Sequence, residues 1–370
     1  MDCVCVHLGA GYHSAKKLHV YKELCLKACK EGMKVLEETN DSVAAVTATV
    51  TVLEDSPLTN AGTGSNLTTD GSVECDAGLM EARSLKFAGV GAAAGVRNPI
   101  QVAKMMVDEQ KAEPKLRERK ILGITLLTYT YIIKSISGPG VSRWAAERGM
   151  MEVHPSQLIT EEAIKERKKS LKVLTQAREQ RSSQEAALDT VGAVCVDSQG
   201  NAASAVSSGG ILLKASGRVG HAACFACGCW AQTYCNSADE SCTVAASTSG
   251  CGEDLMRVSL AKQCCDTMAT AENQSEAIVN VFRDQFLESP FLSDVPEKLG
   301  GAVILKCDQD VIELSLAHTT PSFIVAYQTR QHTKAKVLVS RCNDEKKVGT
   351  SVTVQGEMIN LRKKRKCSDP

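Results

Sequence analysis

The segment that follows Thr190 constrains the fold more than any other part of the chain. It reads VGAVCV and ends at the polar turn 197–200, Asp-Ser-Gln-Gly. A run of small and apolar residues that ends at such a turn is typical of a buried strand. The pattern therefore places Thr190 at the start of a strand, which is a rigid position for a reactive side chain.

The pair Asp189-Thr190 predicts a nucleophile that is made by cleavage of the chain itself. If the bond between them is cut, the freed α-amine of Thr190 lies within reach of its own hydroxyl. Such an amine, with a pKa of about 7.7 to 8, is a usable general base near neutral pH. The branched Cβ also restricts χ1 and holds the hydroxyl in few rotamers. The competing interpretation is an ordinary threonine with high β-propensity at a strand start.

Several short motifs occur in one order along the chain. They are VHLGAGYHS at 6–14, LEDSPLTNAGTGSNL at 53–67, VECDAGLM at 73–80, VSSGG at 206–210 and GRVG at 217–220. Together with TVGAV they resemble the plant-type asparaginase group of N-terminal nucleophile hydrolases, in which an autocleaved threonine heads the second subunit. An ordered set of motifs is far more specific than one glycine-rich loop. The resemblance weakens between about 110 and 188 and after about 345.

The hydrophobic pattern predicts an α/β protein. We expect a strand at 3–7, an amphipathic helix over about 16–38, and a second helix that is capped by Asp41. The glycine-rich stretch 60–66 should be a tight loop, with strands following over 84–95. Helices outside buried strands, together with the resemblance, imply a four-layer α/β/β/α sandwich of the N-terminal nucleophile hydrolase type.

Composition agrees with a soluble enzyme. The chain has 370 residues, 43% hydrophobic content, and 43 basic residues against 43 acidic residues. This balance gives no general attraction to nucleic acid or membranes, and we expect no direct contact with either. Cleavage before Thr190 would divide the chain into an α-subunit, 1–189, and a β-subunit, 190–370.

The 17 cysteines are odd in number and scattered, and no signal peptide precedes them, so we expect reduced thiols in the cytosol or nucleus. One group is dense: Cys224, Cys227, Cys229, Cys235, Cys242 and Cys251. Because it holds a single C-x-x-C pair, buried structural cysteine is favoured over a zinc site. We expect no metal.

Two unusual stretches lie in the weak part of the resemblance. The apolar run 121–136 is about four residues short of a bilayer span and contains Lys134, which argues against a membrane anchor. The polar stretch 161–188 carries seven basic and two acidic residues between Lys165 and Arg181. This composition suits an exposed helix or a mobile cleavage site.

A second basic block, RKKRK, lies at 362–366 within the tail 361–370. Both blocks are typical of nuclear-import signals that an import receptor binds, and equally of solvated charge. Location in the nucleus and cytoplasm is the expectation.

The resemblance implies roles for further residues. Thr190 would be nucleophile and base, and Ser208, eighteen residues later, would hydrogen-bond and tune it. Asn60 matches an asparagine near the α-amine and the oxyanion. Gly11 would let the backbone pass close to the nucleophile.

A second loop, STSGCGE at 247–253, would present substrate-binding groups from Ser249, Gly250 and Gly252. Arg218 in GRVG would bind a substrate carboxylate in a bidentate fork. The resemblance implies no metal or organic cofactor.

Two departures from the asparaginase pattern indicate substrate class. His221 stands where asparaginases have an aspartate that binds the free α-amine, and Asp189 stands where they have glycine before the cleaved bond. Both match the threonine aspartases (taspases) of this group, which cut polypeptides after aspartate. That resemblance implies a proenzyme, αβ units that associate further, and protein substrates with internal Asp. It also implies that these substrates are nuclear transcription regulators, including histone methyltransferases of the mixed-lineage leukaemia type.

Two alternatives stay open at this stage. A β-aspartyl peptidase or L-asparaginase would use the same Thr190 on small substrates. A catalytically defective paralogue acting as a binding protein is the second, and it is encouraged by the unusual segment 121–142.

Overall fold

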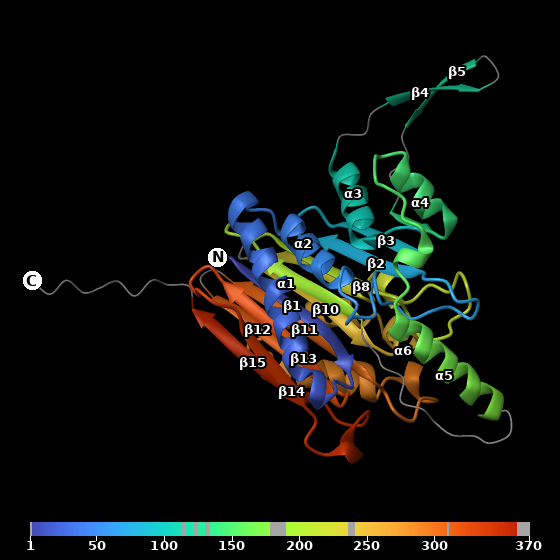
Figure 1. Cartoon of the computed structure of the whole chain (residues 1–370). Helices are drawn as coiled ribbons and strands as arrows, with labels where there is room; N and C mark the ends of the chain where they lie inside the picture. The colour runs from blue at the N-terminus through green and yellow to red at the C-terminus, as the bar shows by residue number, and fades with distance from the viewer. Residues whose placement is uncertain are drawn as a thin grey trace, which may run out of the picture.

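Two large sheets and the helices that pack on them form the body of the molecule (Figure 1). This computed structural model describes residues 2–112, 116–121, 124–129, 134–177, 190–235, 241–308 and 311–360. Asp189 and the tail 361–370 lie outside them. Mixed α/β architecture is confirmed, and the finer expectation of four layers stays a prediction.

The larger sheet has eight strands and contains the strand that begins after Thr190. Neighbouring strands in this sheet are antiparallel, except for the final pair in the spatial order below, which is parallel. In spatial order the strands are β14 (Lys336–Arg341), β13 (Ser322–Thr329), β1 (Cys3–Gly11), β7 (Val191–Val196), β8 (Ala202–Ser208), β2 (Cys75–Glu81), β3 (Lys86–Ala93) and β6 (Ser135–Ser137). Strands from both sides of the expected cleavage point therefore share one sheet, in which β1 lies between β13 and β7.

The smaller sheet has five antiparallel strands, and its β10 contacts β7 and β8 of the larger sheet. Its order is β15 (Thr353–Asn360), β12 (Val311–His318), β11 (Gly300–Asp308), β10 (Ser241–Gly250) and β9 (Cys229–Cys235). A separate hairpin of β4 (Leu116–Ile121) and β5 (Ile124–Tyr129) projects from the body (Figure 1).

Helices pack on both sheets. On the eight-stranded sheet lie α1 (Leu18–Thr39), α2 (Ser42–Glu54) and α3 (Pro99–Lys111). On the five-stranded sheet lie α7 (Leu260–Thr270) and α8 (Gln274–Asn280), which continues into a π-helix over Val281–Leu287. The remaining helices are α4 (Pro139–Ala146), α5 (Glu161–Ala177) and α6 (Gly252–Val258).

The local expectations are confirmed with small changes of boundary. The first strand is longer than 3–7 because Ala10 and Gly11 also pair with β13, after an irregularity in the register between His7 and Ala10. Asp41 caps α2, since its Oδ1 accepts hydrogen bonds from Val43 N at 2.8 Å and Ala44 N at 3.2 Å. The stretch 60–66 is a loop without helix or strand.

The expectation of buried cysteines in the dense group is confirmed for two of the six. Cys227 and Cys229 are buried, whereas Cys235 is exposed at the end of edge strand β9 and the others are half-buried. In the part of the chain that the structure describes, no three His, Cys, Asp or Glu side chains gather as a metal site would require.

The two unusual stretches adopt regular structure in part. Within the described ranges, the chain contains no helix of the length and hydrophobicity that a bilayer span requires. Residues 161–177 of the basic stretch form α5, whereas Arg178 and Arg181 lie outside the described residues. In α5, Arg167 donates from Nη2 to Thr69 O at 2.6 Å, while Lys168 and Lys169 are exposed.

Candidate active site

Thr190 lies directly before β7, and its side chain meets Ser208 at the end of β8. Thr190 Oγ1 donates to Ser208 Oγ at 3.2 Å, and Thr190 is buried. The two strands are antiparallel neighbours with Val191 opposite Ser207, which brings their ends together. Ser208 Oγ also accepts from Gly210 N at 3.0 Å, so its position is fixed from two sides.

A pair that the sequence did not predict lies behind the nucleophile strand. His7 of β1 is opposite Gly192, and its Nε2 lies 2.8 Å from Ser247 Oγ of β10. A Cβ on Gly192 would stand 2.1 Å from Ser247 Oγ and 2.5 Å from His7 Nε2. Glycine within a strand can signal such a close approach, which was the only available clue. Burial lowers the pKa of His7 to about 3, so this imidazole is neutral near pH 7.

Asn60 lies beside the turn that follows Ser208. Its side-chain Nδ2 donates to Gly210 O at 2.9 Å, and its backbone carbonyl oxygen accepts from Gly209 N at 2.7 Å. Asn60 Oδ1 accepts from Asn66 N at 2.9 Å. Asn60 therefore connects the glycine-rich loop to the Ser208 turn, and its role at the α-amine or oxyanion stays a prediction.

The stretch 247–253 is not a loop, because residues 247–250 end β10 and Gly252 begins α6. Its predicted site residues divide between two places. Ser249 Oγ accepts from Ala10 N at 2.9 Å, so this hydroxyl contacts β1. Gly250 has a φ of +144°, and a Cβ there would stand 2.3 Å from Leu299 O. A Cβ on Gly252 would stand 2.9 Å from His221 Nδ1 and 3.5 Å from Arg218 Nη2. Of the three predicted residues in this stretch, Gly252 is therefore the one that lies against Arg218 and His221.

Gly11 ends β1, where its carbonyl oxygen accepts from Ser322 Oγ at 3.0 Å. The left-handed backbone in this motif belongs to Gly9, whose φ is 103°. A close passage of Gly11 beside the nucleophile stays a prediction.

Arg218 forms an ion pair that sequence reasoning missed. Its Nε donates to Glu253 Oε1 at 3.1 Å, and its Nη2 contacts the same oxygen. The Arg218 side chain is 17% exposed and that of Glu253 51% exposed. The two residues are 35 positions apart, and the E of CGE gave no separate signal.

Asp76 holds the backbone beside Arg218, and His221 lies buried next to it. Asp76 Oδ2 accepts from Gly220 N at 2.7 Å, and Asp76 Oδ1 accepts from Ala92 N at 2.8 Å, which fixes the GRVG turn on β2 and β3. Burial lowers the pKa of His221 to about 4. At neutral pH the imidazole is therefore uncharged.

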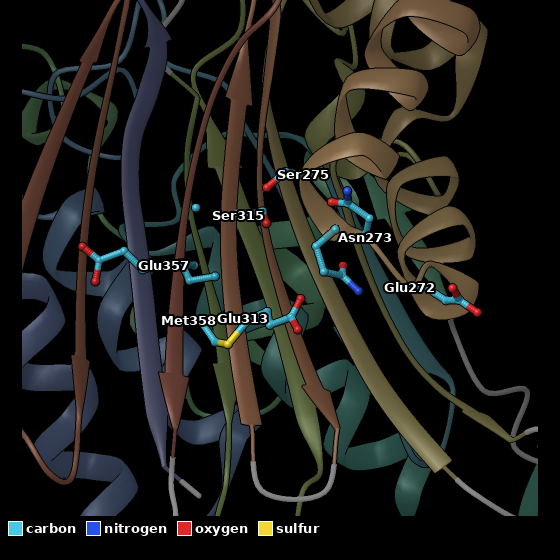
Figure 2. Close-up of a pocket in the computed structure, with 10 residues that line it drawn as sticks. Glu272, Asn273, Ser275, Glu313, Ser315, Glu357 and Met358 are labelled. Atoms are coloured by element: carbon cyan, nitrogen blue, oxygen red, sulfur yellow. The ribbon is translucent and has the colours of Figure 1, made fainter.

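A hollow of about 340 Å³ lies elsewhere, between the start of α8 and strands β12 and β15. Figure 2 shows Glu272, Glu313, Glu357 and Met358 around it. None of the residues predicted for the site lines it, so it takes no part in the chemistry considered below.

A profile of the family described as Asparaginase matches residues 2–113 and 133–337. The chain belongs to the asparaginase family. This places it among the N-terminal nucleophile hydrolases. The unmatched residues 114–132 include the projecting hairpin of β4 and β5, so the first part of the unusual segment lies outside the family match, whereas 133–142 lies within it.

Individual relatives in the asparaginase family are similar over most of their length. An isoaspartyl peptidase/L-asparaginase of Danio rerio is 30% identical over 305 residues, 82% of this chain and 86% of the relative. The Bos taurus protein of that name is 33% identical over 260 residues, covering 70% and 74%. The isoaspartyl peptidase of Escherichia coli strain K12 is 32% identical over 263 residues, covering 69% and 73%.

Proposed function

We propose that this chain is a self-processing amide hydrolase in which cleavage between Asp189 and Thr190 exposes Thr190 as an N-terminal nucleophile. The observation that carries the proposal is the hydrogen bond from Thr190 Oγ1 to Ser208 Oγ at the start of a buried strand. Ser208 Oγ, fixed by Gly210 N, orients the Thr190 hydroxyl.

Each step moves one proton. Thr190 Oγ1 attacks the substrate carbonyl carbon while its proton passes to the α-amine of Thr190, and the resulting ammonium then protonates the leaving amine. Water then attacks the acyl carbon while the same amine accepts the water proton, and the resulting ammonium returns a proton to Oγ1 as its bond to the acyl carbon breaks. The α-amine is the only base that this sequence of steps requires.

For substrate class we propose peptide bonds that follow aspartate, as in threonine aspartases. The Arg218 guanidinium suits the side-chain carboxylate of aspartate. His221 is buried and neutral, so it offers no charge to a free α-amine. The nuclear transcription regulators named by the resemblance are the substrates that this proposal favours, and the acting form would be a pair of αβ units.

A second candidate is isoaspartyl peptidase or L-asparaginase activity, and the names of the relatives favour it. The position of Glu253 also favours this second candidate. Its half-exposed carboxylate beside Arg218 is a possible partner for the α-amine of a small substrate, in place of the aspartate that His221 replaces.

Competition among three substrates separates the candidates. The purified, processed protein is incubated with a peptide containing internal Asp, with a β-aspartyl dipeptide and with free L-asparagine. The first candidate predicts hydrolysis of the peptide on the carboxyl side of Asp and slow turnover of the others. Preferential turnover of the dipeptide or of asparagine would establish the second candidate instead.

A further inference from the structure

Lys214 is a buried cation that takes no part in the proposed catalytic steps. It is 1% exposed, and its Nζ donates to Glu74 O at 2.6 Å. An ammonium has three donors, and burying it is costly unless a negative group compensates. Within the described ranges of the chain, Lys214 forms no ion pair at contact distance. Because the Lys214 ammonium is buried and has one carbonyl partner, binding of an anion beside it would compensate its charge.

The position of Gly210 shows where such an anion would lie. Gly210 has a φ of +74°, and a Cβ built on it would stand 3.1 Å from Arg218 Nη1 and 3.3 Å from Lys214 Nζ. Both nitrogens therefore flank the space that the missing side chain leaves. They are close enough together to bind the two oxygens of a single carboxylate.

Arg218 is oriented so that one nitrogen faces this space. Its Nε and Nη2 are occupied by Glu253, which leaves Nη1 on the side of Gly210 and Gly220. A Cβ on Gly220 would stand 2.9 Å from the same Nη1. Two glycines thus keep side chains away from Nη1.

The acidic groups nearby are engaged elsewhere. Both oxygens of Asp76 accept backbone N–H groups, and burial raises the pKa of this carboxyl. The Glu74 carboxylate accepts from Ser216 Oγ at 2.7 Å and from Gly217 N at 2.8 Å. A Cβ on Gly220 would stand 3.1 Å from Asp76 Oδ2 as well, so the Asp76 carboxylate reduces the positive potential at both Lys214 and Arg218 without forming an ion pair at contact distance with either.

We propose that Lys214 Nζ and Arg218 Nη1 form a carboxylate-binding cradle beside Gly210, which makes Lys214 a second determinant of selectivity for acidic substrates. The placement agrees with the chemistry, because Gly210 follows Ser208 by two residues and donates to its Oγ. The catalytic use of this cradle rests on the proposed function, whereas binding of a carboxylate to it does not.

The test replaces Lys214 by methionine, which has similar length and no charge. The matched control is Lys306→Met, because Lys306 is also buried, at 8% exposed, and its Nζ donates to the carbonyl of Ala271 at 3.1 Å on the other sheet. Two peptides that differ only in Asp or Asn at the cut are compared. Lys214→Met should lower the Asp-to-Asn ratio of kcat/KM at least about tenfold, mainly through KM for the Asp peptide. Lys306→Met should leave the ratio unchanged. Equal loss on both peptides would assign Lys214 a structural role and overturn the proposal.

A binding measurement keeps this inference separate from the proposed function. Succinate is added to each protein and the change in Tm is recorded. Succinate should raise the Tm of the parent and of Lys306→Met, and raise that of Lys214→Met less than one tenth as much at equal concentration. Absence of an effect on the parent would overturn the cradle even if the peptides are cleaved. If Lys214→Met does not fold, Lys214→Arg provides the test, since it should retain the response to succinate.

Discussion

At the scale of single residues, the site depends on few side chains whose partners come from distant parts of the chain. The Thr190–Ser208 contact spans 18 residues, whereas His7 and Ser247 are 240 residues apart. Spacing and motif order predicted the first pair. They did not predict the second, because a long-range contact depends on how two sheets pack and leaves no local pattern in the sequence.

Removal of the Ser208 hydroxyl tests its orienting role. Ser208→Ala deletes the acceptor that Thr190 Oγ1 and Gly210 N share, and a net hydrogen bond contributes about 0.5 to 1.5 kcal/mol. We expect roughly threefold to tenfold slower processing and hydrolysis with unchanged far-UV circular dichroism. Ser208→Thr, which keeps a hydroxyl, is the control and should retain more activity. Full activity of Ser208→Ala would show that the Thr190 hydroxyl is oriented by other groups.

Arg218 provides the second residue-scale prediction. Arg218→Ala should lower kcat/KM on the Asp peptide by more than about tenfold, because a hydrogen bond to a charged group is worth about 1.5 to 3 kcal/mol. Glu253→Gln is the informative comparison, since it keeps the side-chain shape and removes the ion pair that orients Arg218. A smaller loss than for Arg218→Ala is expected. Unchanged kcat/KM in Arg218→Ala would exclude it from substrate binding.

At the scale of elements, strand β7 is the part of the fold that fixes the nucleophile. Its apolar run and the turn 197–200 predicted a strand, and the structure confirms it as Val191–Val196. The helix that Asp41 caps was also predictable, because a capping side chain acts locally. The extension of β1 to Gly11 was not, since it depends on pairing with β13 more than 300 residues away.

Packing behind β7 predicts a sharp response at Gly192. Gly192→Ala places a Cβ at 2.1 Å from Ser247 Oγ, which requires movement of β10 or His7. We expect destabilisation of about 1 to 3 kcal/mol by denaturant unfolding, in the range of overpacked cores. Gly140→Ala is the control, because outside the backbone of its own helix the nearest atom to its Cβ would be Ile136 Cγ1, 3.8 Å away. Similar stability of the two variants would contradict the tight contact.

At the scale of the whole molecule, cleavage before Thr190 would leave two chains that share one sheet. In this sheet β1 of the first part lies between β13 and β7 of the second, so the parts are expected to stay together after cleavage. The motifs indicated the family, yet they did not reveal this alternation, because strand order depends on tertiary packing.

Buried histidines give the whole fold a predicted pH dependence. Burial lowers the pKa of His7 to about 3, and those of His13, His221 and His318 to about 4, from the ordinary 6.5. Below pH 6.5 the unfolded chain binds protons that the folded chain does not, so stability falls by up to about 1.4 kcal/mol per pH unit for each histidine. Glu54, whose pKa burial raises to about 8, acts in the opposite direction between pH 4.5 and 8.

The four histidines outweigh the single Glu54 below pH 6. We therefore expect a lower free energy of unfolding at pH 5 than at pH 6.5 in urea titrations. A value that is equal or higher at pH 5 would contradict burial of neutral histidines.

Entry into the nucleus is the prediction for the two basic blocks. Lys168 and Lys169 are exposed on α5, so their charge is accessible to an acidic import receptor, whereas 362–366 lies outside the described residues. We expect a fusion protein with Lys168 and Lys169 replaced by Ala, together with loss of 362–366, to leave the nucleus. This pair avoids Arg167, which bonds Thr69 O, so that α5 stays docked. The measurement is the nuclear accumulation of the variant fusion, imaged in cells and compared with that of the parent fusion. Unchanged nuclear accumulation would show that import uses another route.

The most direct test of the account is N-terminal sequencing of the fragments of the purified protein. The account predicts that the 39.5 kDa chain divides into two bands and that the smaller fragment from the second half begins at Thr190. Thr190→Ala should remain a single inactive chain, while Thr190→Ser should retain some cleavage. Efficient cleavage of Thr190→Ala, or a second fragment that begins at another residue, would contradict Thr190 as the nucleophile.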